Sequence, residues 1–168
     1  SFGYKVGNFA ANHFAGIKNT LRPVLGLADF GHSVLGTKAM SSITKGMHNA
    51  FGIPLWTPAM PKAFKTNSQL STPAPRQNKV VYFPSCINQT MGLPKKSPVE
   101  QALVSKMIAL LQKGGYEVIF PKNMEKLCCG TIWESKGMLD IADRKTTELE
   151  AALWEASEQG RYPVLCDQ

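Results

Sequence analysis

The chain is short of charged side chains, and it has no long hydrophobic run. Charged residues make up 18% of it, against roughly a quarter in an average soluble domain. No stretch comes near the roughly 18 consecutive apolar residues of a membrane-spanning helix, and no secretory pattern opens the sequence. We therefore expect a cytoplasmic chain whose cysteines are reduced.

Acidic residues are nearly absent from the first half. Residues 1–80 hold nine Lys or Arg and the single acid Asp29, whereas residues 81–168 hold ten bases and eleven acids. A basic half of this kind can be solvated, or it can contact an anionic membrane surface or an acidic partner domain. We expect no nucleic-acid partner, because the bases are spread singly and no zinc-finger, helix-turn-helix or RNA-binding pattern accompanies them.

Motifs for organic catalysis are absent as well. The histidines His13, His32 and His48 have no second histidine or carboxylate at ligand spacing. No Ser/His/Asp set, paired-carboxylate signature or glycine-rich phosphate loop occurs. The sequence therefore predicts no catalytic residue, and we do not expect this chain to carry out the organic step of a reaction by itself.

Apolar residues at steps of three and four predict helix in the first third of the chain. The first helix is expected over residues 2–35, with Pro23 kinking or restarting it, and the second over residues 37–50, ending at Gly52. Five prolines among polar residues indicate that residues 53–78 form an extended connection without a regular element.

A different pattern begins at Lys79. Short apolar runs of strand type alternate with amphipathic helices, which predicts a βαβαβ order and a parallel sheet. The first of these helices has a capping box in Ser97, Pro98 and Glu100. The expected strands cover residues 80–83, 117–120 and 163–165, and the expected helices cover residues 97–113 and 134–158.

The predicted fold class is α/β, with a helical N-terminal part followed by a βαβαβ parallel-sheet cysteine-rich domain. Residues 1–66 form the basic helical region with its proline-rich packing segment, residues 67–78 form a linker, and residues 79–168 form the cysteine-rich domain. Strands joined by right-handed crossovers run parallel, so the residues that follow them meet at one edge of the sheet.

All four cysteines lie in this second part. Cys128 and Cys129 are adjacent, 41 residues separate Cys86 from Cys128, and 35 separate Gly130 from Cys166. A disulfide between adjacent cysteines is strained, because neighbouring side chains on extended backbone point to opposite sides. A tight turn can instead aim two thiolates at different metals, and the glycine lets the backbone approach inorganic sulfur. Because Cys86 and Cys166 follow strands, we expect all four thiols to converge.

The residues alone leave three kinds of site open. The thiols can hold an iron-sulfur cluster, they can hold a structural zinc ion, or they can be metal-free thiols that are buried or redox-sensing. Zinc fingers usually pair their cysteines over a short spacer, and this chain has no such pair. Without iron, the chain would be a structural or interaction domain whose basic half docks a partner.

The spacing of the cysteines resembles the CCG domain, a cysteine-rich module with Cys-Cys-Gly at its centre and Cys-x-x-Cys at its end. That family includes the cysteine-rich component of heterodisulfide reductase and the iron-sulfur component of glycolate oxidase. A closer resemblance is to the C-terminal region of bacterial FAD-linked D-lactate, or D-2-hydroxy acid, dehydrogenases. It is carried by the segments LRPVLGLAD at residues 21–29, PLWTPAMPK at residues 54–62 and YFPSC at residues 82–86.

The resemblance implies an electron-transfer module with a 4Fe-4S type cluster held by Cys86, Cys128, Cys129 and Cys166, with Gly130 permitting the turn. It further implies an FAD domain in the same full-length chain and a respiratory acceptor such as a quinone, with peripheral contact at the inner face of the bacterial membrane. The first gap is slightly longer than usual in the family, and the final Cys-x-x-Cys is cut off. We therefore expect a fragment that is truncated at its C-terminal end and inactive alone.

Overall fold

The computed structural model describes residues 2–52, 55–64 and 78–167, which form a mixture of helices and strands. None of the described helices is both long enough and apolar enough to cross a bilayer. In chain order the elements are α1 (Phe2–Asn12), α2 (Phe14–Phe51), β1 (Pro61–Ala63), β2 (Asn78–Phe83), α3 (Cys86–Thr90), β3 (Met91–Pro94), α4 (Leu103–Lys113), β4 (Tyr116–Ile119), the 3-10 turn η2 (Met124–Lys126), α5 (Thr131–Glu134), α6 (Leu139–Ala156) and β5 (Val164–Cys166).

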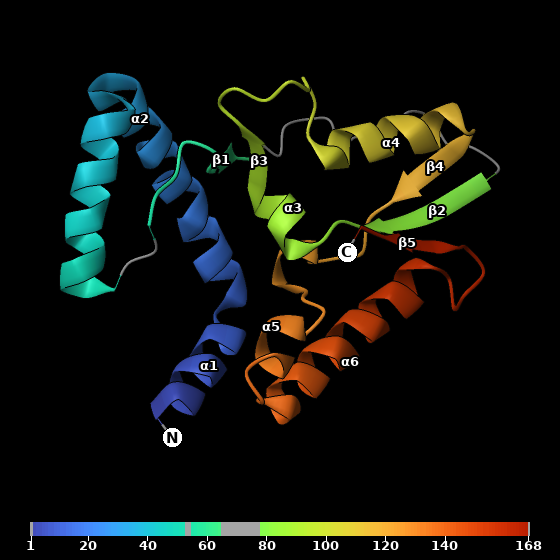
Figure 1. Cartoon of the computed structure of the whole chain (residues 1–168). Helices are drawn as coiled ribbons and strands as arrows, with labels where there is room; N and C mark the ends of the chain where they lie inside the picture. Colours follow the sequence, from blue (N-terminus) through green and yellow to red (C-terminus); the bar gives the residue numbers. More distant parts are fainter. Residues whose placement is uncertain (1, 53–54, 65–77, 168) are drawn as a thin grey trace.

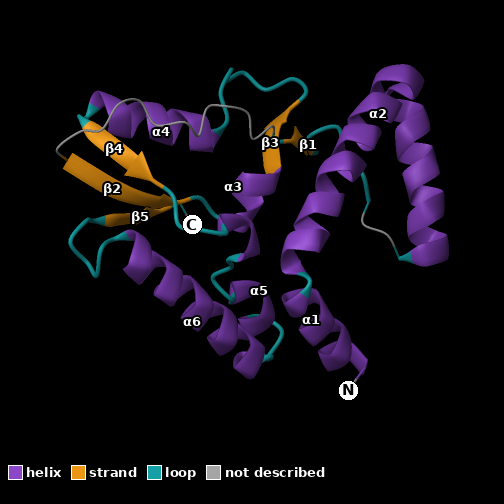
Figure 2. Ribbon diagram, turned by 180° about the vertical axis from the view of Figure 1, so that it is seen from behind, coloured by secondary structure: helices purple, strands orange, loops and turns teal. Residues whose placement is uncertain are grey.

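The main sheet has three strands in the order β4-β2-β5, and both pairings are parallel, as the sequence predicted. Helix α4 lies on one face of this sheet and α6 on the other (Figures 1 and 2). Val80 and Tyr82 pack with Ile108 of α4, whereas Phe83 packs with Leu149 of α6. Side chains of a strand alternate between its two faces, so the apolar run of β2 serves both layers.

The N-terminal helices break at one expected and one unexpected place. The boundary expected between residues 35 and 37 is confirmed, because Gly36 has a φ of 77° and a ψ of 172°, which are not helical. The interruption at His13, between α1 and α2, was not expected, and the helix does not restart at Pro23, because α2 continues through it. A helix can continue through a proline when packing offsets the lost hydrogen bond, whereas glycine adopts positive φ without steric cost. The helix ends at Gly52, as expected, with the Gly52 N–H donating to His48 O at 2.8 Å.

Helix α4 begins at Leu103, so the predicted start at Ser97 is wrong. The backbone N–H of Ser97 donates to Pro94 O at 3.1 Å, and its side chain accepts from the Val99 N–H at 3.2 Å. The polar groups that suggested a capping box therefore form a local turn. A serine side chain can bond the backbone of a turn as well as cap a helix. The helix ends at Gly114 and Gly115, as expected.

Two further differences concern the connections. The helix expected over residues 134–158 is divided into α5 and α6 near Gly137, which has a φ of 70°. The connection expected to lack a regular element contains β1, which pairs antiparallel with β3. The predicted linker over residues 67–78 lies outside the described residues, except for Asn78, which begins β2.

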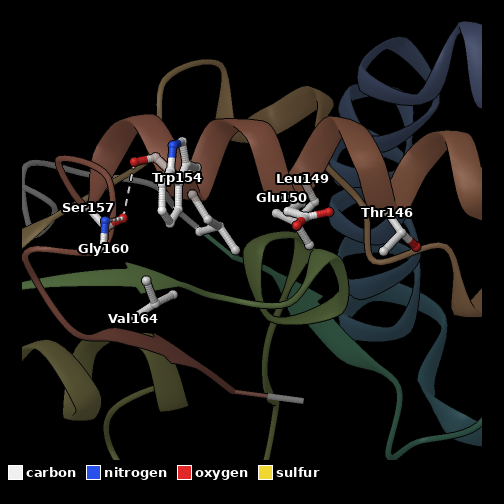
Figure 3. A pocket seen from close by; sticks show the side chains of 8 residues that line it. Thr146, Leu149, Glu150, Trp154, Ser157, Gly160 and Val164 are labelled. Atoms are coloured by element: carbon white, nitrogen blue, oxygen red, sulfur yellow. Dashed lines mark hydrogen bonds between the residues drawn. The ribbon is translucent and has the colours of Figure 1, made fainter.

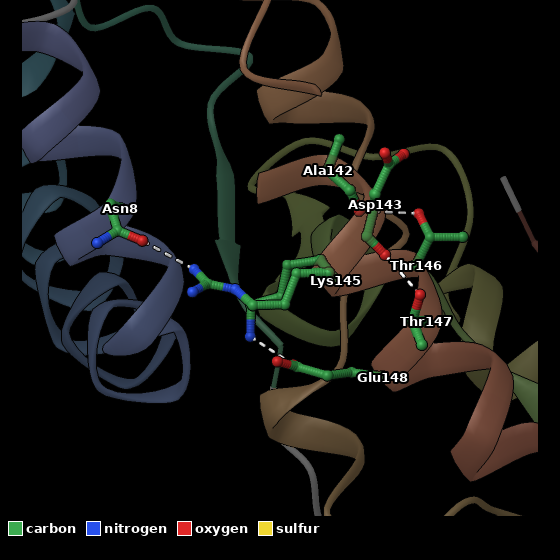
Figure 4. Close-up of polar contacts among 8 residues, drawn as sticks. Asn8, Ala142, Asp143, Lys145, Thr146, Thr147 and Glu148 are labelled. Carbon is green, nitrogen blue, oxygen red and sulfur yellow. Dashed lines mark hydrogen bonds and ion pairs between the residues drawn. The ribbon is translucent and has the colours of Figure 1, made fainter. Parts of the chain in front are cut away.

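Helix α1 packs against α5 and α6, which lie between β4 and β5 in the chain. The Trp133 indole N–H donates to Gly7 O at 3.0 Å, and Arg144 Nη2 donates to Asn8 Oδ1 at 2.9 Å. Figure 4 shows Asn8 facing α6, with the ion pair of Lys145 and Glu148 on the same helix. The basic helical region is thus in direct contact with the cysteine-bearing region.

The two faces of α4 give a matched test of this layer arrangement. Ile108 is 5% exposed against the sheet, whereas Leu110 is 64% exposed. Ile108→Ala should lower the free energy of unfolding by about 2–5 kcal/mol, because it leaves a cavity. Leu110→Ala should change it by no more than about 0.5 kcal/mol. Urea denaturation of the two variants checks this, and equal losses would contradict the packing of α4 on β2.

Candidate metal centre

The first cysteine lies where β2 ends and α3 begins. Pro84 stops the strand, and Ser85 becomes the N-cap of α3 with its side chain accepting from the Asn88 N–H at 3.4 Å. Serine is favoured at this position because its oxygen satisfies an amide that the first turn leaves without a partner. Cys86 is therefore the first residue of α3, directly beyond the carboxyl end of the central strand.

The last cysteine is brought to the same place by β5. Cys166 pairs in register with Phe83 of β2. The carboxylate of the next residue, Asp167, accepts from the Ser85 N–H at 2.5 Å and from the Tyr82 hydroxyl at 2.5 Å. Burial and this hydrogen bond raise the pKa of Tyr82, so its hydroxyl stays a donor. Asp167 thus fixes the end of β5 to the turn that carries Cys86.

The adjacent cysteines lie in the loop between η2 and α5, and their surroundings differ. Cys128 is 1% exposed and packs with Ala11, Trp133 and Ile141, with Cys86 at the border of the same cluster. The Cys129 thiol donates to Thr131 Oγ1 at 3.3 Å. Cys129 borders the cluster that contains Cys128, and it also borders a second cluster formed by Phe83, Leu127 and Leu149.

Electrostatic interactions connect the thiols in one series. A hydrogen bond from the Cys128 thiol lowers the pKa of Cys86 to about 6, and the charge of Lys18 contributes in the same direction. The same hydrogen bond and burial raise the pKa of Cys128, and the charge of Cys129 acts in the same direction. Burial raises the pKa of Cys166, and the charges of Asp167 and Cys129 act in the same direction. Cys86 therefore interacts with Cys128, Cys128 with Cys129, and Cys129 with Cys166.

Gly130 has a structural reason to be glycine. Its φ is 87°, and a Cβ at this position would lie 2.7 Å from the backbone oxygen of Ala142 and 2.9 Å from Thr146 Oγ1. Any larger residue would push α6 away from the cysteine loop, since Cβ atoms do not approach other heavy atoms so closely. Thr146 Oγ1 also lies 2.9 Å from Cys129 O, which holds the loop on α6. An approach of Gly130 to inorganic sulfur remains a prediction.

The structure adds three residues that the sequence reasoning missed. Lys18 Nζ donates to Gln89 Oε1 at 2.7 Å, and Arg22 Nη2 donates to Gln89 O at 2.9 Å. Lys18 is only 5% exposed. A signal was available, because Lys18 lies four residues after Phe14 and seven before Leu25, on the apolar side of the predicted helix.

All four cysteines are free thiols in this structure. Among the described residues, no group of three or more His, Cys, Asp or Glu side chains is compact enough to hold a single metal ion. The arrangement is therefore a pair, Cys86 with Cys128, flanked by Cys129 and Cys166, and not a closed tetrahedral set.

A groove of about 490 Å³ lies between α6 and β5 (Figure 3). Leu149, Trp154 and Val164 line it, and Thr146 at one end reaches the cysteine loop through Cys129 O. No cysteine is among its lining residues, so the groove is separate from the candidate centre.

No protein-family model, no curated protein and no solved structure matches the chain.

The role of Gly130 can be tested against a second glycine. Gly137 also has positive φ, at 70°, but a Cβ there would meet nothing within 4 Å. Gly137→Ala should cost about 1–2 kcal/mol of stability through backbone strain alone. Gly130→Ala should cost about 1–3 kcal/mol more than that, because of the collision with α6. Chemical denaturation of both variants measures the difference, and equal costs would contradict the close approach.

Proposed function

We propose that this chain is an iron-sulfur electron-transfer module of the CCG type. The observation that carries the proposal is the gathering of four free cysteines from three separate segments at the carboxyl edge of the main sheet. Cys86, Cys128, Cys129 and Cys166 would hold a 4Fe-4S type cluster. Such a cluster, when bound, accepts and releases single electrons.

The donor set fits a cluster better than a zinc ion. Four thiolates on one tetrahedral zinc lie about 2.3 Å from a common point, which requires a compact group of sulfurs. The cysteines of a cluster bind separate irons and can lie farther apart. The described residues contain no compact group of three or more ligands for a single ion.

The chain's own residues supply the surroundings that such a centre needs. Trp133 is 5% exposed and packs on Cys128, so it keeps water from that side. The adjacent Ile132, by contrast, is 58% exposed. Asp167 fixes the position of Cys86 by binding the preceding amide.

One observation favours a second candidate. Cys86 and Cys128 share a hydrogen bond, and the pKa of Cys86 is lowered to about 6, as in thiol pairs that undergo oxidation. A metal-free redox-sensing or structural domain would use this pair without iron. The two candidates differ in metal content, which makes them separable by direct analysis.

The wider role that we propose follows from the resemblance. The module would belong to an FAD-linked D-lactate or D-2-hydroxy acid dehydrogenase, and its partners would be an FAD domain of the same chain and a respiratory acceptor such as a quinone. It would act in the cytoplasm, at the inner face of the bacterial membrane. An iron-sulfur component of the heterodisulfide reductase or glycolate oxidase type is the alternative setting.

Metal analysis after anaerobic reconstitution tests the proposal. The unaltered chain should bind about four irons and an equal amount of acid-labile sulfide. Cys128→Ser and Cys129→Ser should each lose most of the iron and the EPR signal of the reduced centre, because each removes a ligand. Ser135→Ala, which changes an exposed residue of the same region, should retain both.

Two results would contradict the proposal. One is stoichiometric zinc with no iron in the unaltered chain. The other is the same iron content in the unaltered chain and in both cysteine variants.

A further inference from the structure

A buried cation lies beside the candidate centre. Lys18, on α2, is 5% exposed, and its ammonium group lies 5.3 Å from the centroid of the Phe14 ring. Taking an ammonium group out of water costs several kcal/mol unless an opposite charge compensates it. None of the ion pairs found among the described residues includes Lys18. Its ammonium group donates instead to the neutral side-chain amide of Gln89.

Gln89 holds this cation beside the turn that carries Cys86. It lies three residues after Cys86 on α3, it is buried, and its Nε2 donates to Pro84 O at 2.7 Å. The Gln89 side-chain oxygen is therefore directed to Lys18, while its backbone oxygen accepts from Arg22. One glutamine thus connects two cations of α2 to the turn that presents the first cysteine.

The charges around Lys18 point to an anion at this place. Burial lowers the pKa of Lys18, and the nearby Arg22 lowers it further, because like charges repel. The groups that favour its charged form are Cys86, Cys128 and Glu125. Burial and a neighbouring cation both disfavour the charged form of Lys18, and negative charge beside it favours that form.

We infer that Lys18, supported by Arg22 through Gln89, compensates the negative charge of the centre that the cysteines hold. Lys18 lies at this place by geometry, because the Phe14 ring beneath its ammonium group packs with Cys86 against the cluster that contains Cys128. A cluster with four thiolate ligands is anionic, so the same cation would favour its reduced form and raise its potential. That the bound centre is an iron-sulfur cluster rests on the proposed function. The positive electrostatic potential that Lys18 produces at the thiols does not rest on it. Lys18 is thus a positioning and charge-compensating residue contributed by the helical region.

The field is measured on the metal-free chain with two alkylating reagents. Iodoacetate is anionic and iodoacetamide is neutral, and both attack the same thiolate, so the ratio of their rates at Cys86 reports the local charge. Mass spectrometry assigns the modified residue. Lys18→Met should lower the ratio of anionic to neutral rate about threefold or more, and Lys18→Arg should restore most of it.

Lys45→Met is the matched control, because it removes an exposed lysine from the same helix. It should leave the ratio unchanged. A purely structural effect of Lys18→Met would change both rates together and leave their ratio as it was. If Lys18→Met does not fold, the unaltered chain still tests the inference. Its ratio of iodoacetate to iodoacetamide rate should fall as the salt concentration rises, because salt screens the cation.

The loaded chain gives a second readout. In an EPR-monitored redox titration, Lys18→Met should change the ratio of reduced to oxidised centre about tenfold at a fixed potential, a downward shift of about 59 mV for one electron. If no variant binds iron, the proposed function fails, and the alkylation ratio alone judges the role of Lys18. Equal ratios in the unaltered chain and Lys18→Met, with no dependence on salt, would overturn the inference.

Discussion

The parallel pairing of β2 with both of its neighbours is the constraint on which the rest of the structure depends. β2 is the central strand, and its Val81 and Tyr82 are completely buried between the layers. Because β4 and β5 run in the same direction beside it, the loops that follow all three strands leave at one edge. Cys86 follows β2 and Cys166 ends β5, so the direct pairing of these two strands brings both residues to that edge.

The helical region gains a role from this arrangement. Helix α1 packs beside Cys128 through Ala11, and α2 brings Lys18 and Arg22 to Gln89. A basic half that the composition left open to solvent, membrane or partner therefore places two of its cations inside the molecule. The helical region and the cysteine-rich domain follow each other in the sequence. In the structure, the contacts named above join these two regions.

Sequence patterns predicted the parts of this structure that depend on local chemistry. The β-branched and aromatic run at residues 80–83 could only be a buried strand, and Gly52 and Gly114 ended helices as their lack of a Cβ allows. The start of α4 was misplaced because Ser97 can bond a turn as well as a helix. The sequence did not predict the contact between Lys18 and Gln89. That contact depends on how α2 crosses α3, and no local sequence pattern indicates the crossing. The strand order predicted that the thiols meet at one edge of the sheet. Which thiols interact with each other could be seen only in the structure.

The position of Asp167 near the end of the sequence affects the order in which the four thiols come together. The strand that carries Cys166 and the carboxylate that binds the Ser85 amide are both synthesised after every other element described. When α6 has been synthesised, the first three cysteines are in the chain, yet the turn bearing Cys86 still lacks the carboxylate that fixes it. Contacts between residues so distant along the chain form late in folding. The set of four thiols is therefore complete only after β5 joins the sheet.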